Sequence, residues 1–410
     1  MEIIVERCCG LDIDQATVVA CLLINVAGKK PRKVIKTFST MTRDLIALRD
    51  WLQSEGSSSV GMESTGVYWM PVYAILEGHF ELIVGNAQHI KNVPGRKSDV
   101  KDAEWIADLV RHGLIKASYV PNQELRALRD LLRYRRKVVE NRTAERNRLT
   151  KLLEQANVKL SGVIADLFGV SGMLMLKAIV EGQATIMQMA QLAKGKLRKK
   201  IGQLELALDG RIEQHHRFIL SMQIGRLEQM DRDLELLEAR IDEKLSPFRE
   251  QHQLLQQIPG VDWVVAAVII VDMGVDMGVF GSAQKAAAWA GVSPGNNESG
   301  GKRLSGKKRT GNIFLTTMLV EAATAAARSK GTYLKDKFHR LKARRGYKRA
   351  IVAIAHKILI SAFHMLSTGA QYQELGETYL DNRDKTRVAA NLIRRLHRLG
   401  YEVDVKPKAA

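Results

Sequence analysis

The chain has 410 residues, of which 46% are hydrophobic and 26% are charged, and its formal net charge is +19. This length allows two or three domains with buried cores, and the composition excludes a disordered tail and a fibrous protein. The charge is uneven, because residues 1–118 hold 14 Lys/Arg and 14 Asp/Glu, so the whole excess lies in residues 119–410. A neutral N-terminal part and a basic C-terminal part favour a catalytic domain joined to a region that binds polyanions.

Membrane and secreted proteins are disfavoured. The purest apolar run, residues 263–271, is too short to span a bilayer, and the N-terminus lacks the basic stretch and apolar core of a signal peptide. The cysteines Cys8, Cys9 and Cys21 form no CxxC pair and fall in β-rich segments. We therefore expect buried free thiols in a reducing, cytoplasmic compartment, and no zinc site.

The front of the chain alternates between strand and helix patterns. Three β-rich stretches come first, and helical and β-rich stretches then alternate. The expected strands are residues 3–13, 17–26, 33–38, 58–62 and 80–84, and the expected helices are residues 43–54, 68–76 and 102–111. A strand meander followed by alternating helix and strand is the element order of a ribonuclease-H-like domain, so the fold class is α/β here.

Four acidic residues stand at the ends of these elements. Asp12 ends the first strand, Glu63 ends the fourth, and Asp99 and Asp102 begin the late helix on one face. If the first and fourth strands are neighbours, these hard oxygen donors meet at one sheet end and suit Mg²⁺. Each acid alone is more often a turn former or a helix cap than a metal ligand, whereas the four together fit one fold in chain order; Asp14 is the nearest competitor of Asp12.

The middle of the chain is helical and basic. Residues 122–160 have leucines at three–four spacing and predict one long helix, in which residues 126–151 carry ten Lys/Arg and three acids. This excess favours contact with phosphates over a merely solvated face. The residues expected to bind nucleic acid here are Arg133, Arg135, Arg136, Arg142, Arg146 and Arg148.

Residues 208–245 have the apolar spacing of a coiled coil. The expected seam changes register after Gly225, and it suits an antiparallel arm within the chain or dimerisation. Its members are Ile212, His215, Ile219 and Met222, followed by Leu227, Met230, Leu234, Leu237 and Ile241.

The back of the chain contains a second candidate site. A Pro-Gly turn at residues 258–261 resembles a helix-hairpin-helix element, whose backbone N–H groups can hold a phosphate. A glycine-rich basic loop follows at residues 291–312, where Ser299 and Ser305 are both candidate nucleophiles. The basic residues expected to contact nucleic acid in this half are Lys302, Arg303, Lys307, Lys308, Arg309, Arg344 and Arg345.

Five sequence strings, spread over about 310 residues in order, resemble the DEDD insertion-sequence transposases, which are bridge-RNA-guided serine recombinases. The strings are Gly10-Leu11-Asp12, Met62 to Gly66, Lys97 to Ala103, Ile258 to Val261, and Ala290-Gly291 through Ser299-Gly300 to Gly311-Asn312. Each string is weak alone, and the set is specific. Ser293 before Pro294 departs from the family pattern, which leaves Ser293 as a rival serine.

The resemblance implies a set of domains and a mechanism. The domains would be a RuvC-like carboxylate domain (1–121), a basic helix and coiled-coil region (122–250), a mainly helical transposase domain (251–375) and a basic tail (376–410). Ser299 would form a covalent phosphoserine with DNA, assisted by Mg²⁺ on Asp12, Glu63, Asp99 and Asp102. A noncoding bridge RNA would pair with target and donor DNA, and the protein would be a tetramer built from dimers, cytoplasmic and associated with the bacterial nucleoid.

Two other classes of protein stay open. One is a metal-dependent, RuvC-like junction nuclease without a serine nucleophile, in which the back half only binds DNA. The other is an RNA-binding protein without catalytic activity. A Ser299→Ala variant separates the nuclease from the recombinase, because only the recombinase would lose its covalent adduct.

Overall fold

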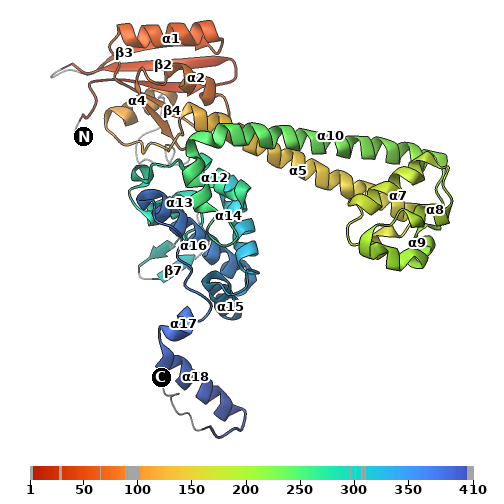
Figure 1. Cartoon of the computed structure of the whole chain (residues 1–410). Helices are drawn as coiled ribbons and strands as arrows, with labels where there is room; N and C mark the ends of the chain where they lie inside the picture. Colours follow the sequence, from red (N-terminus) through yellow and green to blue (C-terminus); the bar gives the residue numbers. More distant parts are fainter. Residues whose placement is uncertain are drawn as a thin grey trace. The chain divides into compact units, whose positions relative to one another are not determined.

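The computed structural model divides the chain into two compact units, Met1–Gln123 and Glu124–Ala410. The first is a mixed α/β sheet domain and the second is almost entirely helical, as the sequence predicts (Figure 1). The residues described are 3–26, 30–64, 66–87, 90, 102–295, 297–300, 302–305, 308 and 311–403, with the backbone alone at 297–299 and 302–305.

The first unit is a five-stranded sheet in the order β3-β2-β1-β4-β5. The first three strands form an antiparallel meander, and β4 and β5 run parallel to β1. The expected order of elements is confirmed, with ends that shift by a few residues. The elements are β1 (Arg7–Ile13), β2 (Thr17–Ile24), β3 (Arg32–Ser39), α1 (Thr42–Ser54), β4 (Ser59–Glu63), α2 (Trp69–Leu76), β5 (Glu81–Gly85) and α4 (Asp102–Arg111).

Helices cover both faces of this sheet because successive strand residues point to opposite sides. Cys9 and Leu11 of β1 pack in the core under α1 and α2, whereas Cys8 packs with Cys21 under α4. The three cysteines are free and buried, as expected. Each face of the sheet therefore has its own apolar core.

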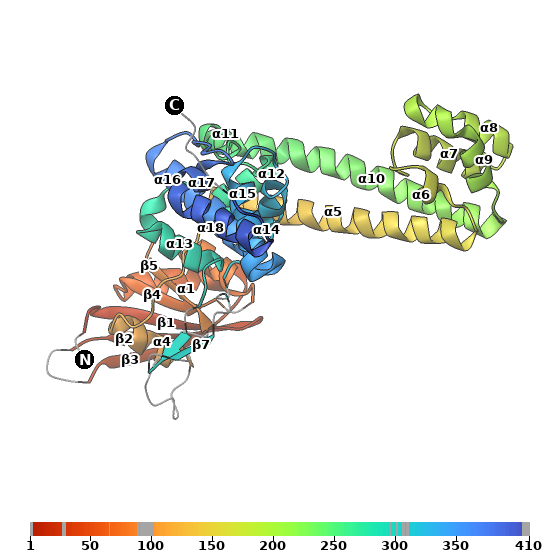
Figure 2. The same cartoon turned by 90° about the horizontal axis from the view of Figure 1, so that it is seen from below.

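The second unit begins with two long helices, α5 (Gln123–Gln155) and α10 (Gln214–Leu245), which lie side by side in both views (Figures 1 and 2). Two ion pairs, Arg135–Glu238 and Arg142–Asp231, join them, and the residue numbers of each pair add up to 373. A constant sum means that one helix advances as the other returns, so the two helices are antiparallel. We call this pair the arm.

The seam of α10 differs from the expected one in its first half. Ile219 and Met222 are exposed, as is the side chain of His215, and the buried residues there are instead Leu220, Gln223 and Ile224. The second half is confirmed at Leu227, Leu234 and Ile241. The buried stripe therefore runs one position later than expected before Leu227, because the far end of α10 packs against additional helices.

Those helices form a small bundle at the far end of the arm, which we call the tip (residues 156–213). It consists of α6 (Leu160–Val163), α7 (Val170–Glu181), α8 (Ile186–Gln191), the 3₁₀ helix η1 (Gly195–Lys200) and α9 (Ile201–Leu208). Its buried residues, such as Leu160, Leu176 and Leu204, form one cluster with Leu149 of α5 and Leu220 of α10.

The remaining helices form the base of the second unit. Its elements are η2 (Ser246–Phe248), α11 (Arg249–Leu255), α12 (Trp263–Met273), η3 (Met277–Phe280), α13 (Ala283–Ala290), β6 (Asn297–Ser299), β7 (Lys302–Ser305), α14 (Ile313–Ala326), α15 (Tyr333–Arg345), α16 (Tyr347–Thr368), α17 (Tyr379–Asn382) and α18 (Lys385–Arg398). Within the described ranges, α16 alone is long and apolar enough to cross a membrane by length and composition. It is a packed core helix here, since Ile354, Ala355, Ile358 and Leu359 are fully buried beside α13, α14 and α15.

The Pro-Gly turn joins α11 to α12, as the sequence predicts, but its glycine is packed rather than open. Gly260 has φ +88°, and a Cβ there would lie 2.2 Å from the carbonyl oxygen of Ala322 in α14. The glycine is needed for this close approach between the turn and α14. A packing role therefore accounts for the turn without a phosphate.

Candidate active site

The parallel register of β1 and β4 brings two of the expected acids together. Gly10 pairs with Gly61 and Leu11 pairs with Met62, so Asp12 and Glu63 each follow at the same sheet end. Because side chains alternate along a strand, Asp12 shares a face with Gly10, and Glu63 shares that face with Gly61. The condition that the sequence left open, that the first and fourth strands are neighbours, is confirmed.

Helix α4 brings the third acid to the same face. A Cβ at Gly10 would lie 2.2 Å from the carbonyl oxygen of Ala103, and one at Gly61 would lie 2.4 Å from a methyl carbon of Val110. The two glycines thus let α4 lie directly on the sheet. Asp102 is the first residue of α4 and precedes Ala103, so it stands over the sheet end that carries Asp12.

The pKa of Asp12 is consistent with acids gathered at this sheet end. Burial raises the pKa of the Asp12 carboxyl, and the negative charges of Asp102, Asp14 and Glu63 raise it further. Carboxylates close enough to repel one another in this way are held together by the fold at the expense of electrostatic energy. Asp14, the nearest competitor of Asp12 in the sequence, is exposed and close enough to contribute. Asp99 lies outside the described residues.

This donor set fits a divalent cation. Hard carboxylate oxygens are the ligands that Mg²⁺ prefers, and a cation would offset the mutual repulsion of Asp12, Glu63 and Asp102. Bound there, Mg²⁺ would stabilise negative charge on phosphate oxygens.

A second group with metal-ligand side chains lies at the start of α10. Single ligand atoms of Glu213, His215 and His216 lie within 4.8 Å of one another. Two of these groups already cap the helix: the Glu213 side chain accepts from backbone, and the Glu213 N–H donates to His216 Nδ1 at 3.1 Å. The positive end of the helix dipole also opposes a cation. We therefore interpret this group as a helix cap.

The basic loop of the sequence contains a hairpin. Strands β6 and β7 pair with Ser299 opposite Lys302, Glu298 opposite Arg303 and Asn297 opposite Ser305. Ser299 is thus the last paired residue before the turn. At the turn, Gly300 has φ +56°, a left-handed conformation that favours glycine. The two serines that the sequence left open lie at opposite ends of the hairpin.

The two ends of the hairpin meet at Gly291 and Gly311, and we call this contact the neck. A Cβ at Gly311 would lie 2.4 Å from the backbone nitrogen of Gly291, so the entry and exit of the loop touch. Pro294 and Lys308 form a β-bridge above this contact, and Lys308 Nζ donates to the Gly291 carbonyl at 3.3 Å. Below it, the Thr316 hydroxyl donates to the Ala290 carbonyl at 2.6 Å. These contacts fix both ends of the hairpin to the helical base.

A buried ion pair lies next to the neck. Asp272 of α12 is 1% exposed, and its Oδ1 is 2.9 Å from Nε of Arg129, although the N–H is not aligned as in a linear hydrogen bond. Burial raises the pKa of the Asp272 carboxyl, and Arg129, Arg133 and Asn312 lower it in part. Asn312 also caps α14 by accepting from the Leu315 N–H at 3.0 Å. Asp272 therefore links α5 to the helix that follows the hairpin.

Sequence reasoning missed Asp272, Arg129 and Asn312 as a group. The available clue was a lone acid, Asp272, at the end of the most apolar run of the chain. A single buried carboxylate in such a run requires a cationic partner. Nothing in the sequence identifies that partner as Arg129, which lies 143 positions earlier.

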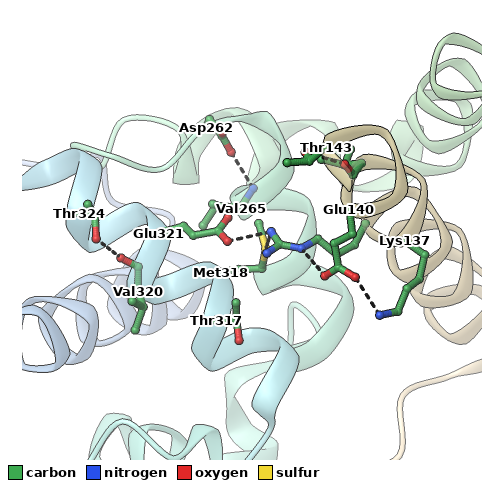
Figure 3. Close-up of polar contacts among 12 residues, drawn as sticks. Lys137, Glu140, Thr143, Asp262, Val265, Thr317, Met318, Val320, Glu321 and Thr324 are labelled. Atoms are coloured by element: carbon green, nitrogen blue, oxygen red, sulfur yellow. Dashed lines mark hydrogen bonds and ion pairs between the residues drawn. The ribbon is translucent and has the colours of Figure 1, made fainter. Parts of the chain in front are cut away.

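The six arginines expected to bind nucleic acid on α5 all have partners within the second unit. Arg136 bridges Glu140 at 3.1 Å and Glu321 of α14 at 2.8 Å, and both glutamates are drawn in Figure 3. Four arginines contact acids and two lie over aromatic rings. The full set of contacts is Arg135–Glu238, Arg136–Glu140 and Glu321, Arg142–Asp231, Arg148–Glu145, Arg133 over Phe314, and Arg146 over Phe168.

The other expected basic residues fall into two groups. Arg344 and Arg345 end α15 and are exposed, and Lys308 is exposed at the neck. Lys302 and Arg303 belong to β7, where only the backbone is described, and Lys307 and Arg309 lie outside the described residues.

Both halves of the chain match transposase families. A DEDD transposase profile of IS110 type matches residues 9–158, and the profile of the transposase IS116/IS110/IS902 family matches residues 252–339. The transposase for insertion sequence element IS1111A of Coxiella burnetii is 27% identical over 275 residues, which are 66% of this chain and 67% of that protein. A protein of Pseudomonas aeruginosa named "Probable family 20 transposase" is 26% identical over 286 residues, or 68% of this chain and 75% of that protein.

The matched stretches correspond to the two candidate sites. The first contains Asp12, Glu63, Asp99 and Asp102, and the second contains the β6–β7 hairpin. The chain is therefore an insertion-sequence transposase of the IS110 family.

Proposed function

We propose that this transposase is an RNA-guided serine recombinase whose carboxylate domain is RuvC-like. The observation that carries the proposal is the convergence of Asp12, Glu63 and Asp102 at one sheet end, where burial and then the neighbouring negative charges raise the pKa of Asp12. Charge repulsion that a fold maintains is typical of functional sites. The antiparallel meander with two further parallel strands supports a ribonuclease-H-like fold for this domain.

In the proposed reaction, the Ser299 hydroxyl attacks a DNA phosphorus atom. A bond forms between Ser299 Oγ and phosphorus, the bond between phosphorus and the departing sugar oxygen breaks, and that oxygen takes the proton. One phosphodiester is exchanged for another, so the broken strand can be rejoined by the reverse reaction. Mg²⁺ on Asp12, Glu63, Asp99 and Asp102 would stabilise the charge that develops on the phosphate oxygens.

The backbone of the hairpin supports the choice of Ser299. It directly precedes the turn, at the end of the hairpin farthest from the neck, whereas Ser305 is paired with Asn297 nearer the neck. A residue at a hairpin turn can reach into a substrate groove. The neighbouring basic residues would neutralise phosphate, although protonated side chains are poor general bases.

The proposed partners are a noncoding bridge RNA and target and donor DNA, with no membrane partner. The net charge of +19 lies wholly in residues 119–410, which suits polyanion binding. We propose assembly as dimers that pair into a tetramer, in which the serine and the carboxylates of one site are free to come from different subunits.

The test is to trap the covalent intermediate. The full-length protein is incubated with a nicked suicide DNA substrate, the co-purifying RNA and Mg²⁺, and the adduct is mapped by peptide mass spectrometry. We expect DNA joined to Ser299 in the wild type and no adduct in Ser299→Ala or Asp102→Asn. Ser305→Ala is the matched control and should still form the adduct.

Three other results would contradict parts of this proposal. An adduct at Ser293 or Ser305 would show that this serine, and not Ser299, is the nucleophile. Continued cleavage by Ser299→Ala without any adduct would favour the metal-dependent junction nuclease. RNA binding without cleavage under any condition would favour the non-catalytic RNA-binding protein.

A further inference from the structure

Almost all of the tip lies between the two stretches that the family profiles match. The first profile match ends at residue 158 and the second begins at residue 252, so α6 to α9 and all of α10 fall between them. The tip nevertheless has a continuous buried core, which includes Leu160, Met175 and Leu204. A domain with its own core, lying between the two stretches that the profiles match, is a candidate for a function of its own.

The tip concentrates its positive charge on η1. Residues 156–213 contain eight Lys/Arg, and five of them fall in residues 194–200. Leu197 packs against the tip core and anchors η1, whereas the charged side chains around it are exposed. These five residues, which we call the tip cluster, are Lys194, Lys196, Arg198, Lys199 and Lys200.

The tip cluster differs in its partners from the other lysines of the tip and from most arginines of α5. The other tip lysines are paired with acids, Lys159 with Glu154 and Lys177 with Glu228, as are five of the arginines on α5. Among the described residues, no carboxylate forms an ion pair with the tip cluster, and Lys200 Nζ donates only to the Val163 carbonyl. Five exposed charges of one sign without counter-charges create a strong local potential.

The arm places this potential far from the base. The 33 residues of α5 span about 50 Å at 1.5 Å per residue. Duplex DNA advances 3.4 Å per base pair, so this reach corresponds to about 15 base pairs. A cation cluster at that distance can contact phosphates well beyond the nucleotides held at the base.

We propose that the tip cluster binds the phosphate backbone of a nucleic acid, independently of sequence, and extends the footprint of the transposase along it. This proposal rests on the proposed function for the presence of a nucleic-acid substrate. The chemistry recognised is the phosphodiester, which either the DNA or the RNA can supply. Lysine-rich contacts of this kind act through counterion release and carry no base readout.

The test compares two double variants of the full-length protein. Lys196→Gln/Lys199→Gln removes two charges from the tip cluster, and Lys159→Gln/Lys177→Gln removes two paired charges from the same tip. All four side chains lie on the surface, and circular dichroism will verify that both variants are folded. Binding is measured against salt concentration with a mixed-sequence DNA duplex and, separately, with a structured RNA transcript, and footprints are taken with hydroxyl radicals.

We expect the tip-cluster variant to lose about tenfold in affinity or more, and its log–log salt slope to fall by about 1.4 to 1.8, for two lost phosphate contacts. Its footprint should shorten at one end only, and the control should match the wild type. The nucleic acid that shows the change is the one that the tip holds.

An unchanged slope and footprint on both DNA and RNA would overturn the proposal, as would equal losses in the control. Adduct formation at saturating DNA is scored in parallel and should persist in the tip-cluster variant. A wild type that forms no adduct refutes the proposed chemistry, whereas the binding measurements still decide the role of the tip.

Discussion

Gly311 packs directly against Gly291, and a Cβ at Gly311 would lie 2.4 Å from the Gly291 nitrogen and equally close to the Trp289 carbonyl oxygen. These glycines are 20 positions apart in the chain, and the β6–β7 hairpin lies between them. The contact closes the loop at its base, so the position of Ser299 depends on two residues that carry no side chain.

Gly311→Ala should therefore displace the hairpin. Backbone atoms cannot yield to a Cβ at this distance, and we expect a loss of about 1 to 3 kcal/mol in the free energy of unfolding. The adduct at Ser299 should fall more than DNA binding does. Gly225→Ala on α10, where a Cβ meets nothing within 4 Å, is the control and should stabilise slightly. Full adduct formation by Gly311→Ala would show that the neck does not position the serine.

Asp272→Ala should destabilise the second unit by about 3 to 5 kcal/mol, because it leaves Arg129 partly buried without its counter-charge. Denaturant unfolding of the full-length protein measures the effect. The double variant Asp272→Leu/Arg129→Leu should recover most of the loss, since a buried ion pair and an apolar pair of similar size are close in stability. A double variant less stable than Asp272→Ala would mean that these side chains have further essential contacts.

Asp12→Asn and Asp102→Asn should each lower DNA cleavage by at least about 100-fold, because each removes one metal-ligand charge. Without divalent metal, Asp12→Asn should also raise the melting temperature, since the pKa of Asp12 is raised and its ionised form is therefore unfavourable in the fold. Added Mg²⁺ should stabilise the wild type more than the variant. Glu104→Gln, on the same helix and paired with Lys33 at 2.8 Å, serves as the control and should keep its activity.

Asp231→Asn/Glu238→Gln should increase the affinity for nucleic acid. These acids neutralise Arg142 and Arg135 across the arm, and their loss makes both guanidinium groups available to phosphates. The effect on stability should stay below about 1 kcal/mol per pair, as for other partly exposed ion pairs. Affinity that does not rise with this variant would count against the expectation that Arg135 and Arg142 bind nucleic acid.

The cysteines should be unreactive in the folded protein. Burial raises the pKa of the Cys8 thiol to about 12 and that of Cys21 to about 11, and raises that of Cys9 well above its usual range. Unfolded thiols ionise near 9.0 while the folded ones stay protonated, so stability should fall as pH rises from 9.0 toward these values. Alkylation at pH 8 in the presence and absence of denaturant measures the reactivity. Rapid labelling of the native protein would contradict this burial.

Local sequence patterns determined many of the secondary-structure elements and several candidate site residues of this protein. Alternation along residues 3–26 and three–four spacing at Leu45, Leu48 and Leu52 predicted the meander and the helix that follows it, because each pattern matches the period of one element. Acids at strand and helix ends indicated Asp12, Glu63 and Asp102 before any contact was known. The charge difference between the two halves also needed only the sequence.

Tertiary structure decided what depends on partners far away in the chain. Basic residues on α5 look alike in sequence, yet acids of α10 and α14 neutralise Arg135, Arg136 and Arg142, while the tip cluster has no acid paired to it among the described residues. The buried face of α10 shifted for the same reason, because the tip core selected Leu220 and Ile224 over Ile219 and Met222. Periodicity determines which residues share a face, but only packing against a partner determines which face is buried and which charges remain for a ligand.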